Sequence, residues 1–180
     1  MVDFELIPYP ADNLPKIAIG GDIQRADNQL SLHYAVTGGL ESILIPPKTD
    51  NVTRKDELWK ATCFEYFLAL PTLPQYWEFN MSPSGNWNIY VMDAYRQINM
   101  RQEQAFTHLP YTFNKVYNQI TLDITVDLNP ILKIDSPLEI AIATIIQTTQ
   151  RNESYWALAH PGAPTAQADF HLRKSFTIHL

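Results

Sequence analysis

Thirteen prolines are spread along the 180 residues of the chain and divide it into short pieces. Proline interrupts an α-helix because it lacks the backbone N–H and because its ring clashes with the preceding turn. Between the prolines, β-branched and aromatic residues come in short runs bounded by turn residues. This pattern is typical of many short strands. We therefore expect an all-β fold, with about ten strands in two stacked antiparallel sheets that form a β-sandwich.

Two stretches predict strands most clearly. Residues 30–36 alternate, with Leu30, Leu32, Tyr34 and Val36 on one side, as in a strand that buries one face. Residues 62–70 are apolar on both sides apart from Glu65, which predicts a central strand covered on both faces. The other expected strands are 43–45, 75–81, 86–92, 106–116, 119–128, 138–148, 155–159 and 176–180, with loops at 48–57 and 161–168 and a short helix within 93–104.

The charge and the cysteine count exclude several classes of protein. The net charge is −6, and the 13 basic residues form no run, so the electrostatic footprint of a nucleic-acid-binding protein is missing. No apolar run approaches the roughly 20 residues needed to cross a bilayer, and the first residues lack the pattern of a secretory signal. The single cysteine, Cys63, excludes an intrachain disulfide. We expect one cytoplasmic domain over residues 1–180, a monomer or a homodimer, with neither nucleic acid nor membrane as a partner.

One face of the expected sheet gathers polar side chains. Residues two apart on a strand share a face, so Glu78 and Asn80 fall on one side of their strand. The residues 82–85, Ser-Pro-Ser-Gly, predict a turn that returns the chain and places Asn88 and Tyr90 beside them. Carboxylates, amides and a phenol on one face suit the recognition of hydroxyl groups, because each offers directional hydrogen bonds. The alternative is a solvated outer face, the usual place for alternate residues of a sandwich. Two further residues could join the set, Glu65 from the neighbouring strand and Arg96 by folding back.

Aromatic side chains supply a second candidate feature. The chain has four Trp, nine Tyr and eight Phe. Most aromatic rings in a sandwich pack in the core. Trp59 and Trp87 each follow a polar stretch, which makes them candidates for stacking on a ligand.

The C-terminal part holds a third polar group. If residues 169–173 are extended, Asp169, His171 and Arg173 project to one side, and His160 could approach them. Such a group could bind a metal, although its spacing matches no zinc signature. The alternative is a hydrogen-bonded network that fixes a loop.

Catalytic and cofactor motifs are weak or missing in the sequence. There is no Gly-x-Ser-x-Gly elbow, and Cys63 lies in an apolar stretch, where a buried, inert thiol is expected. A carboxylate pair such as Glu65 and Glu78 could hydrolyse a glycoside if both faced one cleft. We expect no cofactor. Calcium is a candidate only at Asp50, Asn51 and Asp56, and haem is disfavoured although Met81, Met92, Met100, His108, His160 and His171 could ligate it.

Three segments carry a resemblance to a known family. They are residues 58–68 (LWKATCFEYFL), residues 76–90 (YWEFNMSPSGNWNIY) with Tyr95-Arg96 after them, and residues 154–158 (SYWAL) with Asp169-Phe170-His171. Together they resemble the DOMON-like proteins related to family 9 carbohydrate-binding modules, over residues 55–180. The resemblance implies an immunoglobulin-like or jelly-roll-like β-sandwich and, in the wider superfamily, binding of a sugar or of haem. Trp59 and Trp87 would be the counterparts of the aromatic residues that stack on sugars.

These observations favour a non-catalytic domain that binds a small polar ligand, with carbohydrate as the leading candidate. The expected ligand-binding residues are Trp59, Glu65, Glu78, Asn80, Trp87, Asn88, Tyr90, Arg96, His160, Asp169 and His171. A structural or protein-interaction domain is the alternative, in which the same residues form a closed network. A glycoside-acting hydrolase is a third hypothesis.

Overall fold

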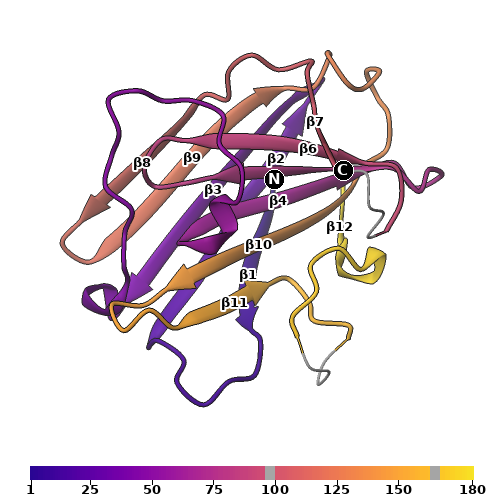
Figure 1. Ribbon diagram of the computed structural model, residues 1–180. Helices are drawn as coiled ribbons and strands as arrows, with labels where there is room; N and C mark the ends of the chain where they lie inside the picture. Colours follow the sequence, from indigo (N-terminus) through magenta and orange to yellow (C-terminus); the bar gives the residue numbers. More distant parts are fainter. Residues whose placement is uncertain (96–99, 163–166) are drawn as a thin grey trace.

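The computed structural model describes residues 1–95, 100–162 and 167–180. Within these ranges the chain forms β-strands and three short 3₁₀ turns (Leu40–Ser42, Leu58–Lys60 and Arg173–Ser175) and no α-helix, so the expected all-β fold is confirmed (Figure 1). Among the described residues, there is no helical segment with the length and hydropathy of a membrane span.

The described residues form twelve strands, all paired in antiparallel fashion. They are β1 (Val2–Pro8), β2 (Ile17–Ala26), β3 (Gln29–Gly38), β4 (Cys63–Ala69), β5 (Tyr76–Met81), β6 (Trp87–Met92), β7 (Arg101–Gln102), β8 (Tyr111–Val116), β9 (Gln119–Asp127), β10 (Glu139–Gln147), β11 (Glu153–Ala157) and β12 (Ile178–His179).

The predicted sandwich of two separate sheets with ten strands is wrong. The strands form one continuous sheet in the order β7-β6-β5-β4-β10-β11-β1-β2-β3-β9-β8, with β12 beside β10. Strand β1 makes the connection, because its first part pairs with β2 while Ile7 and Pro8 pair with β11. The sheet curls so that its two halves meet, and the hydroxyl of Tyr34 on β3 donates to the carbonyl oxygen of Glu65 on β4 at 2.7 Å.

The first two strands were not predicted from the sequence. The pair β2–β3 brings two backbones unusually close at Gly21, where an added Cβ would lie 1.8 Å from the carbonyl oxygen of His33. Only glycine permits this approach. The requirement explains why Gly21 interrupts the alternation of buried and exposed side chains along β2. By contrast, the expected strand at 43–45 is reduced to one bridge between Ile43 and Thr148.

The core lies between the two halves of the curled sheet. Leu30, Leu32, Tyr34 and Val36 are all buried there, as their alternation predicts. Strand β4 is buried along its whole length, which confirms the expectation of a strand covered on both faces.

The outer face of β4, β5, β6 and β10 is covered as well. A second apolar cluster lies on it, in which Phe176 from the C-terminal segment packs over Phe67 of β4 and Tyr76 of β5, and Phe170 packs against Tyr155 of β11. The segment is tied down by the pairing of β12 with β10, visible at the yellow end of the chain in Figure 1. The hydroxyl of Ser175 donates to the carbonyl oxygens of Phe170 and Leu172 and closes the turn.

Candidate functional site

The predicted polar face forms at the centre of this covered surface. The turn between β5 and β6 has the expected geometry, since Gly85 adopts a φ of +95° and its N–H donates to the carbonyl oxygen of Ser82. The resulting register sets Asn80 opposite Asn88 and Glu78 opposite Tyr90.

Glu65 joins the same face from β4, where it lies opposite Asn80. The five side chains that share the face are 0–4% exposed: Glu65, Glu78, Asn80, Asn88 and Tyr90. The alternative of a solvated face is wrong, because the C-terminal segment and Trp59 pack over this side of the sheet.

A pocket of about 180 Å³ opens between this face and the segments that cover it. Ligand sites usually measure roughly 300–1,000 Å³, so this one suits a ligand or a part of a ligand no larger than about one sugar ring. The lining residues combine acids and aromatic rings with apolar side chains. They are Trp59, Glu65, Glu78, Met100, Ile145, Tyr155, Ala168, Phe170 and His171.

Glu65 is the most unusual residue of the pocket. Its side chain is buried, and its Oε1 has no hydrogen-bond partner among the described residues. Burial raises the pKa of Glu65 well above its ordinary value, and the nearby charge of Glu78 raises it further. A buried carboxyl oxygen without a partner is costly, and such groups in natural proteins usually have a function or a missing partner.

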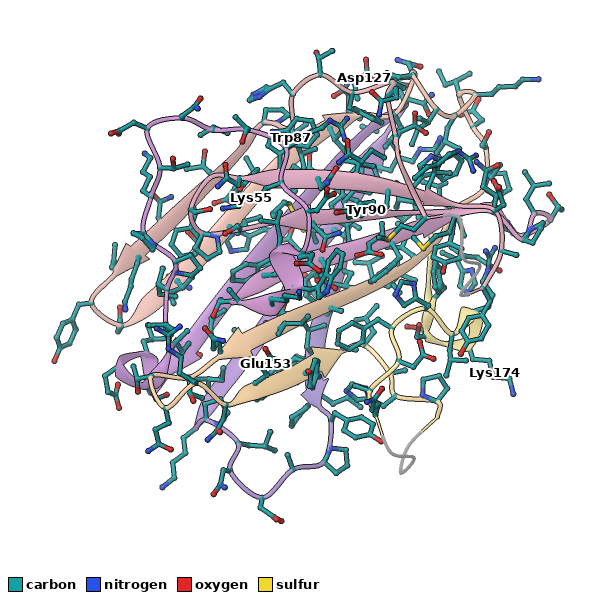
Figure 2. The ribbon with its side chains drawn as sticks, in the orientation of Figure 1. Lys55, Trp87, Tyr90, Asp127, Glu153 and Lys174 are labelled. Carbon is teal, nitrogen blue, oxygen red and sulfur yellow. The ribbon has the colours of Figure 1, made fainter. Side chains whose placement is uncertain are left out.

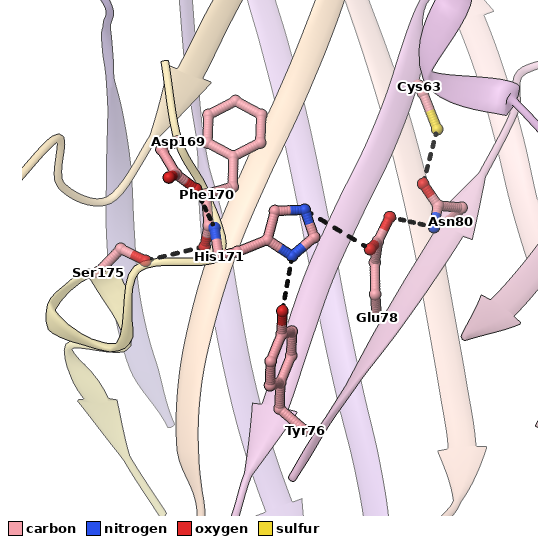
Figure 3. Close-up of polar contacts among 8 residues, drawn as sticks. All are labelled: Cys63, Tyr76, Glu78, Asn80, Asp169, Phe170, His171 and Ser175. Carbon is pink, nitrogen blue, oxygen red and sulfur yellow. Dashed lines mark hydrogen bonds and ion pairs between the residues drawn. The ribbon is translucent and has the colours of Figure 1, made fainter. Parts of the chain in front are cut away.

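Glu78 has partners on both oxygens (Figure 3). Its Oε1 accepts from the amide of Asn80 at 2.7 Å, and its Oε2 lies 4.0 Å from Nε2 of His171. Burial raises the pKa of Glu78, whereas the charge of His171 and the bond from Asn80 lower it. The two acids of the pocket are therefore unequal, because Glu78 is supported by neighbours and Oε1 of Glu65 is not.

The imidazole of His171 is held in place from several sides. Its Nδ1 is hydrogen-bonded to the hydroxyl of Tyr76 at 2.9 Å, and its ring contacts those of Phe67 and Tyr76 edge-on. Asp169 accepts from the backbone N–H of His171 at 3.0 Å (Figure 3). It also accepts from the hydroxyl of Tyr95 at 2.6 Å. Asp169 therefore orients His171. It does not itself line the pocket.

Arg173 does not join this group. Its guanidinium binds Glu139 at 2.6 Å and the carbonyl oxygen of Leu70. In the described part of the chain, no three His, Cys, Asp or Glu side chains come together in a way that could hold a metal ion. The sequence predicted that Asp169, His171 and Arg173 form one group. In the structure Asp169 contacts His171, whereas Arg173 contacts Glu139.

Asn88 and Tyr90 belong to a closed network at the edge of the site. Both donate to Oδ1 of Asp56, at 3.0 Å and 2.7 Å, and Arg54 donates to the amide oxygen of Asn88. These bonds lower the pKa of Asp56, the bond from Tyr90 most strongly. Figure 2 shows Tyr90 on β6 and the loop that carries Lys55. This loop crosses the strand β6. The network anchors this loop to the sheet, and Trp59 follows the loop directly.

The two candidate tryptophans lie on opposite sides of the sheet. Trp59 lines the pocket, and its ring lies 5.8 Å from that of Tyr90. Trp87 is 3% exposed within the inner core, and the guanidinium of Arg54 lies 4.4 Å from the centre of its ring.

Two other predicted residues lie apart from the pocket or cannot be placed. His160 is hydrogen-bonded to the carbonyl oxygen of Ile7 at 2.9 Å and packs against the ring of Tyr9; burial lowers its pKa. Arg96 lies outside the described residues.

Sequence reasoning missed several lining residues, notably Tyr155 and Phe170. Tyr155 could have been found, because Trp156 next to it faces the inner core and neighbouring residues of a strand point to opposite faces. Phe170 had no comparable signal, since its place depends on how the C-terminal segment folds back.

A larger hollow of about 540 Å³ lies on the outer face of the other half of the sheet. Its side chains are hydrogen-bonded to one another, as in His33 with Asp123 at 2.6 Å and Ser31 with Thr125 at 2.9 Å. We place the candidate site in the smaller pocket, because there a buried carboxyl oxygen lacks a partner.

The comparisons with known proteins show a similar fold. No protein-family model matches the chain, and no curated protein matches it. Among solved structures, a protein from Bacteroides uniformis ATCC 8492 matches with a TM-score of 0.69 and 11% sequence identity, over 97% of this chain and 83% of the other. That protein is described as a "putative carbohydrate-binding protein". The match shows that the two chains share a fold.

Proposed function

We propose that the protein is a non-catalytic domain that binds a small carbohydrate in the pocket beside Trp59. The observation that carries the proposal is the pairing of an aromatic ring with buried carboxyl groups in one pocket, with Oε1 of Glu65 left unpartnered. A sugar offers hydroxyl groups for the carboxyl groups and an apolar C–H face for the ring. In this arrangement Glu78 and His171 hold the ligand's polar side, and Trp59 covers its apolar face.

Two likenesses support the proposal. The structurally similar protein from Bacteroides uniformis is described as a "putative carbohydrate-binding protein". The segments around Trp59, Glu65 and Glu78 resemble DOMON-like proteins related to family 9 carbohydrate-binding modules, and we propose membership of that group on this basis. Neither likeness identifies the ligand, so the chemistry of the pocket has to do so.

A thermal-shift screen tests the proposed function. A ligand that binds only the folded protein raises Tm as its concentration exceeds Kd. The panel contains neutral monosaccharides, disaccharides, amino sugars and uronic acids. We expect a dose-dependent rise in Tm with at least one sugar, and we expect Trp59→Ala to abolish it.

A matched control is Trp87→Phe, which changes a tryptophan on the other side of the sheet and keeps an aromatic ring in the core. It should retain the sugar-induced rise even if its own Tm is lower. A flat response of the wild-type protein across the panel would overturn the carbohydrate proposal and favour a structural role, which the closed network of Asp56, Asn88 and Tyr90 also fits.

A glycoside-acting hydrolase, the third hypothesis from the sequence, is a further candidate, because Glu65 and Glu78 line one pocket and both have raised pKa values. Glycosidases use two carboxyl groups that flank the scissile bond. Incubation with aryl glycosides separates the two proposals. If the wild-type protein releases the phenol and Glu65→Gln does not, the protein is a hydrolase and the binding proposal is wrong.

A further inference from the structure

We propose that the pocket selects a ligand that carries an ammonium group, so that among carbohydrates its ligand is an amino sugar with a free amine. This inference rests on the proposed function and names the chemical class of the ligand. It depends on three features of the pocket, namely its acids, its lack of fixed positive charge and its aromatic rings.

The acids are the first feature. Glu65 and Glu78 come from neighbouring strands and line the same small pocket, and each is at least 96% buried. A neutral hydroxyl group could satisfy Oε1 of Glu65 by a single hydrogen bond. An ammonium group offers three donors and a positive charge, so it could bind both carboxyl groups and offset their mutual repulsion.

The charge around the acids is the second feature. Among the described residues that line the pocket there is neither Lys nor Arg, and His171 is the one basic side chain. Its Nε2 is 4.0 Å from Glu78, at the limit of an ion pair, and Glu65 has no cationic partner in the described structure. Two arginines are engaged elsewhere, since Arg54 binds Asn88 and Arg173 binds Glu139. Within residues 1–95, 100–162 and 167–180, the site therefore holds acid in excess of base.

The titratable groups that interact electrostatically with Glu65 add no positive charge either. They are Glu78, the thiol of Cys63, and the phenols of Tyr34 and Tyr155. Each of these groups is neutral or negative. The raised pKa of Glu65 is consistent with a carboxyl group that lacks a counter-ion in the free protein.

The aromatic rings are the third feature. Trp59, Tyr155 and Phe170 all line the pocket, and the rings of Tyr155 and Phe170 lie 6.2 Å apart. Aromatic faces attract ammonium groups through the ring quadrupole, most strongly when water is excluded. An anionic ligand would meet both the acids and these negative faces, so uronic acids are disfavoured.

Isothermal titration calorimetry at neutral pH with four probes tests the inference. The probes are glucosamine, glucose, N-acetylglucosamine and ethanolamine. Glucosamine and glucose differ only in the amine, N-acetylglucosamine keeps the nitrogen without its charge, and ethanolamine carries the ammonium group without a sugar ring. We expect glucosamine to bind at least about tenfold more tightly than glucose or N-acetylglucosamine, the size of a charge-assisted hydrogen bond.

Variants locate the effect. Glu65→Gln keeps the shape of the side chain but cannot form the carboxylate that would bind the ammonium group, so it should reduce the affinity for glucosamine at least about tenfold and abolish the preference over glucose. The matched control is Glu5→Gln on β1, an exposed acid outside the pocket, which should leave every affinity unchanged. Loss of the preference in both variants would contradict the assignment to Glu65.

The outcomes separate this inference from the proposed function. Equal or tighter binding of glucose would overturn the inference and leave the carbohydrate function standing. Binding of ethanolamine as tight as that of glucosamine, with no binding of neutral sugars, would support the ammonium site and overturn the carbohydrate function. Absence of binding by all four probes would overturn the inference, and the thermal-shift panel would then decide the carbohydrate function.

Discussion

Replacing Glu65 by glutamine tests the electrostatics of the pocket without any ligand. The folded protein holds a proton on Glu65 at a pH where the unfolded chain has released it, because burial and the charge of Glu78 raise the pKa only in the folded state. Above pH 4.5, the ordinary value, the folded state therefore binds more protons than the unfolded state. It follows that the free energy of unfolding falls as the pH rises.

The size of the effect follows from proton linkage. Each extra proton held by the folded state lowers the free energy of unfolding by about 1.4 kcal/mol per pH unit. The contribution of Glu65 is fully present below the unfolded pKa, and it is lost as the pH rises through the folded pKa. Glutamine cannot titrate, so the curve of Glu65→Gln against pH should lack this slope.

Urea unfolding followed by tryptophan fluorescence, in a pH series from about 5 to 8, measures the difference. We expect the wild-type stability to fall more steeply than that of Glu65→Gln, by about 1.4 kcal/mol per pH unit until Glu65 ionises. The variant should be the more stable protein at the upper end of the series. Glu5→Gln serves as the control and should run parallel to the wild type. Parallel curves for the wild type and Glu65→Gln would refute the argument.

Three further predictions concern stability and titration. Trp87→Ala should lower the free energy of unfolding by about 3–5 kcal/mol, because it empties a core site; urea unfolding measures this, and a loss below about 1 kcal/mol would contradict its burial. Ser175→Ala should cost about 1–2 kcal/mol by the same measurement, since it removes the hydroxyl that closes the C-terminal turn, and an unchanged midpoint would show that this turn does not hold the segment. Burial and the adjacent Glu153 raise the pKa of Tyr155 to about 12, so the absorbance change of phenolate formation near that pH should shrink in Tyr155→Phe; an unchanged titration curve would contradict it.

The strands with a clear period were predictable from the sequence. The alternation from Leu30 to Val36 and the apolar run around Glu65 correspond to β3 and β4, and the Ser-Pro-Ser-Gly turn gives the register that aligns Glu78 with Tyr90. In each case the information is local, because side-chain period and turn geometry are set by a few consecutive residues.

The connection between the two halves of the sheet was not predictable in this way. It depends on β1 changing partner from β2 to β11, so that Ile7 pairs with Ala157 across most of the chain. Periodicity does not report which strands pair at such a separation. The same holds for the cover of the candidate site, because nothing near Phe170 or Phe176 in the sequence indicates which face of the sheet they pack on.

The four tryptophan side chains offer the most direct test of the central claim that the ligand binds beside Trp59. Their indole N–H groups give separate signals in a ¹⁵N-labelled protein, and the other three are held within the fold: Trp77 donates to Glu103, Trp156 donates to Ser154, and Trp87 packs under Arg54. We expect addition of glucosamine to shift the indole signal of Trp59 in a saturable manner while the other three signals stay in place. A saturable shift of another indole signal with that of Trp59 unmoved would show that the ligand binds elsewhere and would contradict the account.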